Sequence, residues 1–115
     1  MSLLLFLDDV RPAPEGWVLV KTARACIEIL RTEQVEQLSL DHDLGEVTNS
    51  PISGLTERYV PSPEDGSWVV RTMIQENLWP LLKPKVHSAN PPAAERMRGL
   101  IDRYGPYGPD GRRKP

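Results

Sequence analysis

The first apolar segment of the chain is a continuous run from Leu3 to Leu7 that ends at Asp8 and Asp9. A short run that is apolar at every position is typical of a strand buried on both faces of a mainly parallel sheet. After a loop with two prolines and a glycine, Trp17 to Val20 predicts a second strand. The connection has only about nine residues, fewer than a helical crossover needs. Either the usual helix is missing here, or the two strands run antiparallel.

The next part of the chain changes to helical spacing. Thr22 is a suitable helix cap, and the apolar residues after it recur at i, i+3, i+4 and i+7, which predicts a helix with one apolar face. Val35 to Leu40 predicts a third strand. From Glu46 to Pro61 no periodicity persists. Because a loop of this length inside a compact domain is usually functional, we expect it to be a lid.

Two further helices are predicted on either side of a short fourth strand. Ser62 followed by Pro63 and two acids is a typical helix start, with a cap residue and proline at the first helical position. The fourth strand is predicted over Lys85 to Ser88, and the last helix begins at Asn90 and ends at Gly105. This order of strands and helices predicts an α/β fold.

The composition fits one small globular domain. The chain has 115 residues, 39% hydrophobic and 26% charged, with a formal charge of -2. We expect the domain to span residues 1–105, with a loosely ordered tail over 106–115. The single cysteine, Cys26, excludes an internal disulfide and fits a reducing cytoplasm. The longest apolar run is too short to cross a membrane, and the absence of a basic stripe disfavours binding along duplex DNA.

Polar side chains gather at the carboxyl ends of the predicted strands, where open α/β sheets bind their ligands. They are Asp8 and Asp9 after the first strand, Asp41, His42 and Asp43 after the third, and His87, Ser88 and Asn90 after the fourth. Neighbouring carboxylates repel one another unless a cation compensates, and Mg²⁺ is the ion we expect. Histidines at strand ends suit acid–base chemistry near neutral pH, and two of them can flank one phosphorus atom.

Several of these residues have a second possible role. Arg11 either holds a phosphate group or forms a salt bridge with Asp8 or Asp9. Ser88 either donates to a phosphoryl oxygen or satisfies the local backbone. Asn90 is a suitable cap of the last helix, a role compatible with ligand binding. The three tryptophans are expected to be packing residues.

The segments LFLDDVRP, SLDHDLGE and VHSANPPAAERM together resemble a known family. They are similar to the cyclic-phosphate processing receiver domain, a variant within the receiver superfamily of response regulators, over about Leu3 to Tyr104. The resemblance implies a small receiver-like (flavodoxin-like) three-layer sandwich. In this chain we expect a four-stranded, mainly parallel sheet that departs from the receiver pattern by lacking the first crossover helix. The resemblance also implies activity on cyclic phosphates, such as 2',3'-cyclic ends of RNA or cyclic nucleotides.

The resemblance also assigns roles by position. The acidic pair after the first strand matches the Mg²⁺ ligands of receivers, and Asp41 matches their phosphoryl acceptor. The residues that match the cyclic-phosphate variant are His42, Asp43, His87 and Asn90. We therefore expect catalysis by Asp41, His42 and His87, phosphate binding by Arg11, Ser88 and Asn90, and Mg²⁺ binding by Asp8, Asp9, Asp41 and Asp43.

The chain also departs from ordinary receivers. It has no predicted fifth strand that ends in a lysine, since Lys83 and Lys85 precede the fourth strand. The leading hypothesis is a metal-assisted phosphoesterase acting on a small cyclic phosphate or a single-stranded RNA end. The alternative is a non-catalytic receiver-like module that accepts phosphate or binds a protein. A transition-metal hydrolase is disfavoured because neither HxH nor HxxxH spacing occurs.

Overall fold

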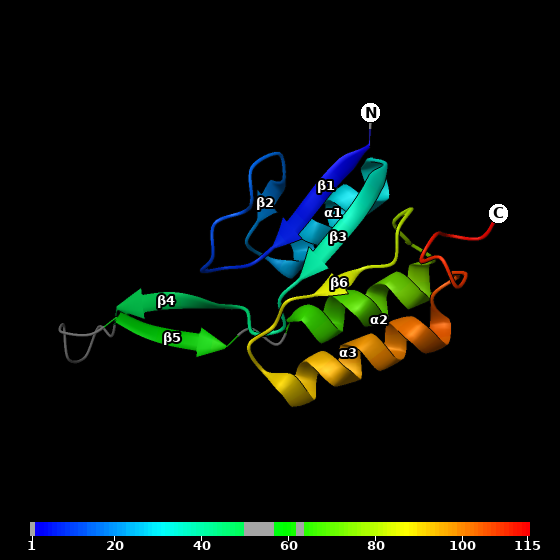
Figure 1. Cartoon of the computed structure of the whole chain (residues 1–115). Helices are drawn as coiled ribbons and strands as arrows, with labels where there is room; N and C mark the ends of the chain where they lie inside the picture. Colours follow the sequence, from blue (N-terminus) through cyan, green and yellow to red (C-terminus); the bar gives the residue numbers. More distant parts are fainter. Residues whose placement is uncertain (1, 50–56, 62–63) are drawn as a thin grey trace.

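The computed structural model describes residues 2–49, 57–61 and 64–115 (Figure 1). The predicted order of strands and helices is confirmed, with one added pair of strands. The elements are β1 (Leu3–Leu7), β2 (Val18–Val20), α1 (Ala23–Thr32), β3 (Val35–Leu40), β4 (Gly45–Asn49), β5 (Glu57–Pro61), α2 (Gly66–Glu76), β6 (Lys85–Val86) and α3 (Pro91–Tyr104).

Four strands form one all-parallel sheet in the order β2-β1-β3-β6. β1 lies in the centre, with Phe6 paired to Leu19 on one side and to Ser39 on the other. No helix joins β1 to β2, yet the two strands are parallel. The missing crossover helix is therefore confirmed, and the antiparallel alternative is excluded.

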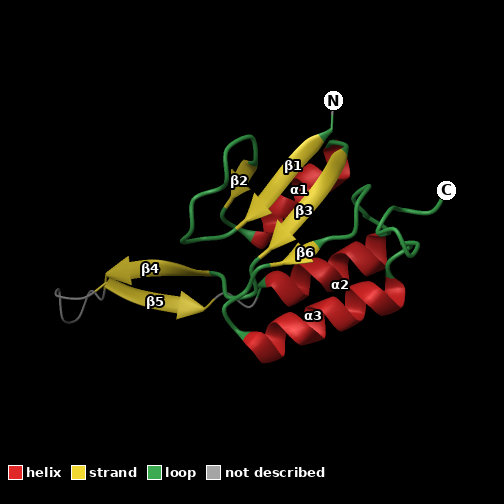
Figure 2. Ribbon diagram, viewed as in Figure 1, coloured by secondary structure: helices red, strands yellow, loops and turns green. Residues whose placement is uncertain are grey.

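All three helices cover the same face of this sheet (Figure 2). Leu5 and Leu40 point to that face and belong to one core cluster with Ile27, Val70 and Met97 of the three helices. α1 contacts α2, and α2 contacts α3. The sandwich thus has two layers among the described residues, where we expected three.

The handedness of crossover connections explains the difference in layering. The connections β2 to β3 and β3 to β6 cross the sheet in the same direction, so right-handed crossovers place their helices on one face. A helix between β1 and β2 would cross in the opposite direction and cover the other face. Because that helix is missing, the face that carries Phe6 and Ser39 has no helix in the described part of the chain.

β4 and β5 form an antiparallel hairpin that projects from the domain (Figure 1). We expected an aperiodic loop over Glu46 to Pro61, and this is wrong for residues 46–49 and 57–61. The two strands pair with each other through their backbones, and backbone pairing needs no regular apolar alternation in the sequence. Residues 50–56 lie outside the described part of the chain, and the role of the segment as a lid stays a prediction.

Two of the three helix caps are the residues that the sequence predicts. The side chains of Thr22 and Asn90 accept hydrogen bonds from backbone N–H groups three residues later, at 3.2 and 3.3 Å. The cap of α2 is Asp65, whose Oδ1 accepts from the N–H of Trp68 at 3.0 Å. The helix therefore begins later than expected. The predicted cap Ser62 and the proline after it lie outside the described residues.

The last ten residues contact the loop between α2 and β6. The hydroxyl of Tyr107 donates to the Pro80 carbonyl at 2.7 Å, and its ring packs edge-on against Trp79. Arg113 donates to the Trp79 carbonyl at 2.6 Å. The tail is therefore held by specific contacts, unlike the loose tail that we expected. Polar side chains in the tail satisfy carbonyl groups that no strand or helix pairs, which composition alone does not reveal.

Candidate functional site

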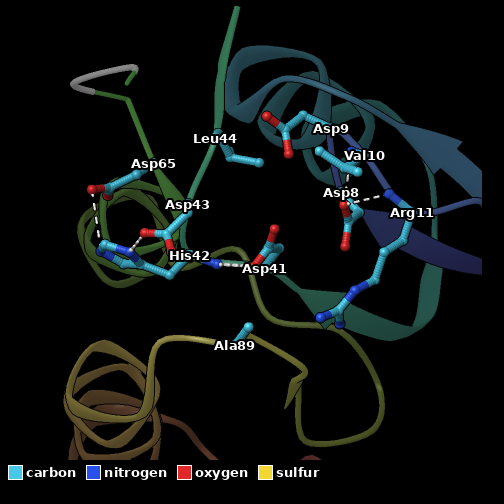
Figure 3. A pocket seen from close by; sticks show the side chains of 10 residues that line it. All are labelled: Asp8, Asp9, Val10, Arg11, Asp41, His42, Asp43, Leu44, Asp65 and Ala89. Atoms are coloured by element: carbon cyan, nitrogen blue, oxygen red, sulfur yellow. Dashed lines mark hydrogen bonds and ion pairs between the residues drawn. The ribbon is translucent and has the colours of Figure 1, made fainter. Parts of the chain in front are cut away.

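A cleft of about 550 Å³ opens at the carboxyl ends of β1 and β3 (Figure 3). Backbone pairing continues past both strands, with the N–H of Asp8 bonded to the Val20 carbonyl and that of Asp41 to the Leu7 carbonyl. The two acids therefore emerge side by side. The cleft is lined by Asp8, Asp9, Val10, Arg11, Asp41, His42, Asp43, Leu44, Asp65 and Ala89.

Three of the four predicted metal ligands come together. Asp8, Asp9 and Asp41 each offer one carboxylate oxygen, and these oxygens lie within 4.8 Å of one another. Ligands on opposite sides of Mg²⁺ lie about 4 Å apart, since each is about 2.1 Å from the ion. Hard carboxylate oxygens at this spacing fit the ion. Asp43 lies outside this group, because its carboxylate contacts His42 instead.

Asp8 is held as a charged group in a buried position, with only 1% of its surface exposed. Burial by itself raises its pKa. The N–H groups of Arg11 and Val10, at 2.8 and 2.9 Å from Oδ1, and the imidazole of His87 together outweigh this and lower the pKa below its ordinary value. Asp8 therefore stays ionised and available to a cation.

Asp41 shows the opposite shift. Burial is the largest cause, followed by the negative charge of Asp8, and together they raise its pKa. The N–H of His42, which donates to Asp41 Oδ1 at 2.8 Å, opposes this only in part. The metal-free cleft therefore contains charge repulsion, which a bound cation would relieve.

His42 stands on the wall of the cleft between two carboxylates (Figure 3). Its Nδ1 lies 2.7 Å from Oδ1 of Asp43, and its Nε2 lies 3.2 Å from Oδ2 of Asp65. The carbonyl of His42 accepts a hydrogen bond from the N–H of Gly66 at 3.1 Å. Sequence reasoning missed Asp65 as a site residue, because an acid at a helix start is explained by capping alone.

His87 contacts Asp8 and is not among the residues that line the cleft. Its Nε2 is 2.9 Å from Oδ2 of Asp8, and its Nδ1 is 2.7 Å from Oγ of Ser39. The expected arrangement, with two histidines on opposite sides of one phosphorus atom, is therefore not what the structure shows. Ser39 was also missed, although a hydroxyl in an otherwise apolar strand end is a signal that could have found it.

The three predicted phosphate-binding residues have backbone partners. The guanidinium of Arg11 donates to the His87 carbonyl at 2.9 Å, and Arg11 lines the cleft. Oγ of Ser88 accepts from the N–H of Asn90 at 3.1 Å, and Asn90 caps α3. Ser88 and Asn90 shape the turn that brings Ala89 to the cleft. Their contact with phosphate stays a prediction.

A comparison with protein families gives the same assignment as these residues. The family model described as cyclic-phosphate processing receiver domain matches residues 3–103. The chain belongs to this family. The match takes in all the strands of the receiver sheet and every residue of the cleft. No curated protein and no solved structure matches this receiver domain. No helix in the described ranges has the length and apolar character of a membrane span.

Proposed function

We propose that this receiver domain is a cation-dependent phosphoesterase that opens or removes cyclic phosphates. The observation that carries the proposal is that His42 shares one cleft with the three clustered carboxylates. A module that only accepts a phosphoryl group needs the acids but has no use for an acid–base residue on the same wall. Membership of the family supports a cyclic phosphate as the substrate.

Asp8, Asp9 and Asp41 are the residues that would hold Mg²⁺. When bound, the ion would supply positive charge to the non-bridging oxygens of the phosphate. The raised pKa of Asp41 supports this assignment, because the charge repulsion that causes it is relieved by a cation. Arg11 lines the same cleft and would add a second positive group for the phosphate, exchanging its bond to the His87 carbonyl for one to the substrate.

His42 is the acid–base residue in this proposal. Ring opening forms a bond from a water oxygen to phosphorus and breaks one ring P–O bond. One proton must leave the water, and one must reach the departing oxygen. Asp43 holds Nδ1 at 2.7 Å, whereas the contact of Nε2 with Asp65 is longer at 3.2 Å. Nε2 is therefore the atom that would exchange a proton with the substrate.

A phospho-accepting module without catalysis is the second candidate, and the place of Asp41 in the carboxylate cluster favours it. Such a module would be modified on Asp41 by acetyl phosphate. The two candidates differ at His42, whose replacement leaves phosphate acceptance intact but removes turnover.

The test is incubation of the full chain and Mg²⁺ with 2',3'-cyclic nucleotides, 3',5'-cyclic nucleotides and cyclic-ended RNA. We expect turnover of at least one of them, with His42→Ala and Asp9→Asn each slowing it about 100-fold or more. Asp102→Asn removes an exposed carboxylate of α3 and is the matched control, expected to retain full activity. Turnover of none of these substrates, together with stable labelling of Asp41, would favour the second candidate.

A further inference from the structure

Two polar contacts link three strand ends on the sheet face that no helix covers in the described part of the chain. Oγ of Ser39 lies 2.7 Å from Nδ1 of His87, and Nε2 of His87 lies 2.9 Å from Oδ2 of Asp8. Ser39 is only 8% exposed and Asp8 only 1%. The three residues come from β3, from the end of β6 and from the end of β1. A buried serine is thus connected to a candidate metal ligand through one imidazole.

The imidazole is supported from the same face of the sheet. Its ring stacks on Phe6 with 4.4 Å between centroids and 4° between planes. Trp17 packs edge-on against Phe6 at 6.2 Å. Phe6 and Ser39 are paired in register on adjacent strands, so both the stacking ring and the hydroxyl belong to the rigid sheet. The plane of the imidazole is therefore set by packing, and its two nitrogens are set by hydrogen bonds.

The direction of these hydrogen bonds follows from the donors available. An ionised carboxylate only accepts, so Nε2 of His87 must carry the proton that faces Asp8. In a neutral imidazole Nδ1 then has no proton and accepts one from the Ser39 hydroxyl. The Asp8 carboxylate therefore selects the Nε2–H tautomer, and the Ser39 hydroxyl is the donor that this tautomer needs at Nδ1.

The hydrogen bonds that the Asp8 carboxylate accepts leave few of its lone pairs for a cation. A carboxylate has about four lone-pair positions. The N–H groups of Val10 and Arg11 both donate to Oδ1, and His87 donates to Oδ2. One position remains, on Oδ2, and its direction depends on where the imidazole holds that oxygen.

We propose that Ser39 and His87 are positioning residues that orient the Asp8 carboxylate for a divalent cation. The inference rests on the proposed function for the cation site. It goes further in giving His87 a role through Asp8 instead of on the substrate, and in adding Ser39, to which the sequence analysis assigned no role. Partners of this kind change metal affinity when they are removed.

The test measures Mn²⁺ binding to the metal-free full chain by electron paramagnetic resonance. We expect Ser39→Ala to weaken binding about 10-fold. Thr72→Val is the matched control, because Thr72 is also buried, at 7% exposed, and its hydroxyl donates within α2 to the Trp68 carbonyl. It removes a buried hydroxyl of similar kind and should leave the affinity unchanged. Wild-type affinity in folded Ser39→Ala overturns the inference.

A double-mutant cycle tests whether Ser39 acts through His87. In a His87→Ala background, Ser39→Ala should cause no further loss of Mn²⁺ affinity. A further loss of similar size means that Ser39 acts by another route, and the inference fails.

A measurement on the wild-type chain covers the case in which the variants do not fold. With ¹⁵N-labelled histidine at alkaline pH, we expect His87 in the Nε2–H tautomer, with a His42→Gln variant used to assign the two signals. The Nδ1–H tautomer contradicts the proposal. A wild-type chain that binds no Mn²⁺ overturns the proposed cation site together with this inference, whereas Mn²⁺ binding that is insensitive to Ser39 overturns this inference alone.

Discussion

Burial and the negative charge of Asp8 raise the pKa of Asp41, so the ionised form of this residue costs folding stability. A group whose pKa is raised by folding contributes stability below its unfolded pKa, and that stability is lost as the pH rises through the folded pKa. At neutral pH Asp41 therefore destabilises the metal-free domain. We expect Asp41→Asn to raise the midpoint of thermal unfolding by a few degrees, measured by circular dichroism without metal.

Addition of Mg²⁺ should make the wild type more stable than Asp41→Asn. A ligand that binds only the folded state at 100 times its Kd stabilises by about 2.7 kcal/mol. The wild type should gain this stability, while Asp41→Asn should gain little. Asp102→Asn serves as the control and should respond to Mg²⁺ like the wild type. Equal stabilisation of Asp41→Asn by Mg²⁺ would show that Asp41 is not a ligand.

The opposite pKa shifts of Asp8 and Asp41 also predict how cation affinity depends on pH. The pKa of Asp8 is lowered, so Asp8 stays ionised at a pH where an ordinary aspartate is already protonated. The pKa of Asp41 is raised, so Asp41 takes up a proton at a pH where an ordinary aspartate is still ionised. Because this proton competes with the cation, Mn²⁺ affinity should fall as the pH drops through the raised pKa of Asp41. Titrations of Mn²⁺ at a series of pH values measure this. In Asp41→Asn the fall should shift to lower pH, and an unchanged profile would refute the assignment.

Single residues were predictable where the strand-end rule applies. Asp8, Asp9, Asp41 and His42 follow apolar runs directly, so parallel pairing brings them together. His87 was placed correctly at a strand end, but its contacts depend on side-chain partners that spacing does not encode. Ser39 and Asp65 were missed because a strand hydroxyl and a helix cap each have an ordinary local explanation.

At the scale of elements, the start of α2 approaches the backbone of the site very closely. A Cβ atom on Gly66 would lie 2.2 Å from the Asp41 carbonyl oxygen and 2.9 Å from Cα of His42. Gly66→Ala must therefore push the helix away from both residues. We expect a loss of about 2–3 kcal/mol in the free energy of unfolding, measured in urea, and weaker Mn²⁺ binding.

The matched control for this prediction is Gly99→Ala. Gly99 lies inside α3, and a Cβ there has nothing within 4 Å. Alanine in a helix interior should stabilise the domain by about 0.5–1 kcal/mol, with unchanged Mn²⁺ binding. If the two glycine variants behave alike, the close approach at Gly66 has no energetic importance.

The helices and strands that contact the hydrophobic core were predictable from the sequence. The three helices have apolar faces and capping residues, and the central strands are continuous apolar runs. β4 and β5 were missed because, within the described residues, they pair with each other and with no strand of the main sheet. Their pairing depends on the backbone of both strands, and backbone pairing leaves no apolar period in the sequence.

At the scale of the whole molecule, the C-terminal segment ties the end of the chain to the loop after α2. Tyr107→Phe removes the hydrogen bond to the buried Pro80 carbonyl. We expect it to cost about 1 kcal/mol in urea unfolding without changing Mn²⁺ affinity. Tyr104→Phe is the control, since Tyr104 is 49% exposed, and it should be neutral. A neutral Tyr107→Phe would mean that the tail contributes little to stability.

The layering of the molecule was harder to predict than its elements. The handedness of a crossover assigns its helix to one face of the sheet only when the order of the strands is known. The order β2-β1-β3-β6 could not be derived without knowing whether β2 runs parallel to β1. The short connection after β1 left that direction open in the sequence. Once the strands are known to be parallel, the single-sided helical layer follows.

The hydrogen bond between the His42 carbonyl and the Gly66 N–H closes the chain on itself at the base of the hairpin. The projecting arm formed by β4 and β5 therefore begins and ends beside this one hydrogen bond, as a closed loop does. The entropy of closing a loop rises only with the logarithm of its length, and doubling the length costs about 0.6 kcal/mol. A shorter or longer arm can therefore be attached at this point at little cost in stability, provided that Asp43 and Asp65 keep their places beside His42.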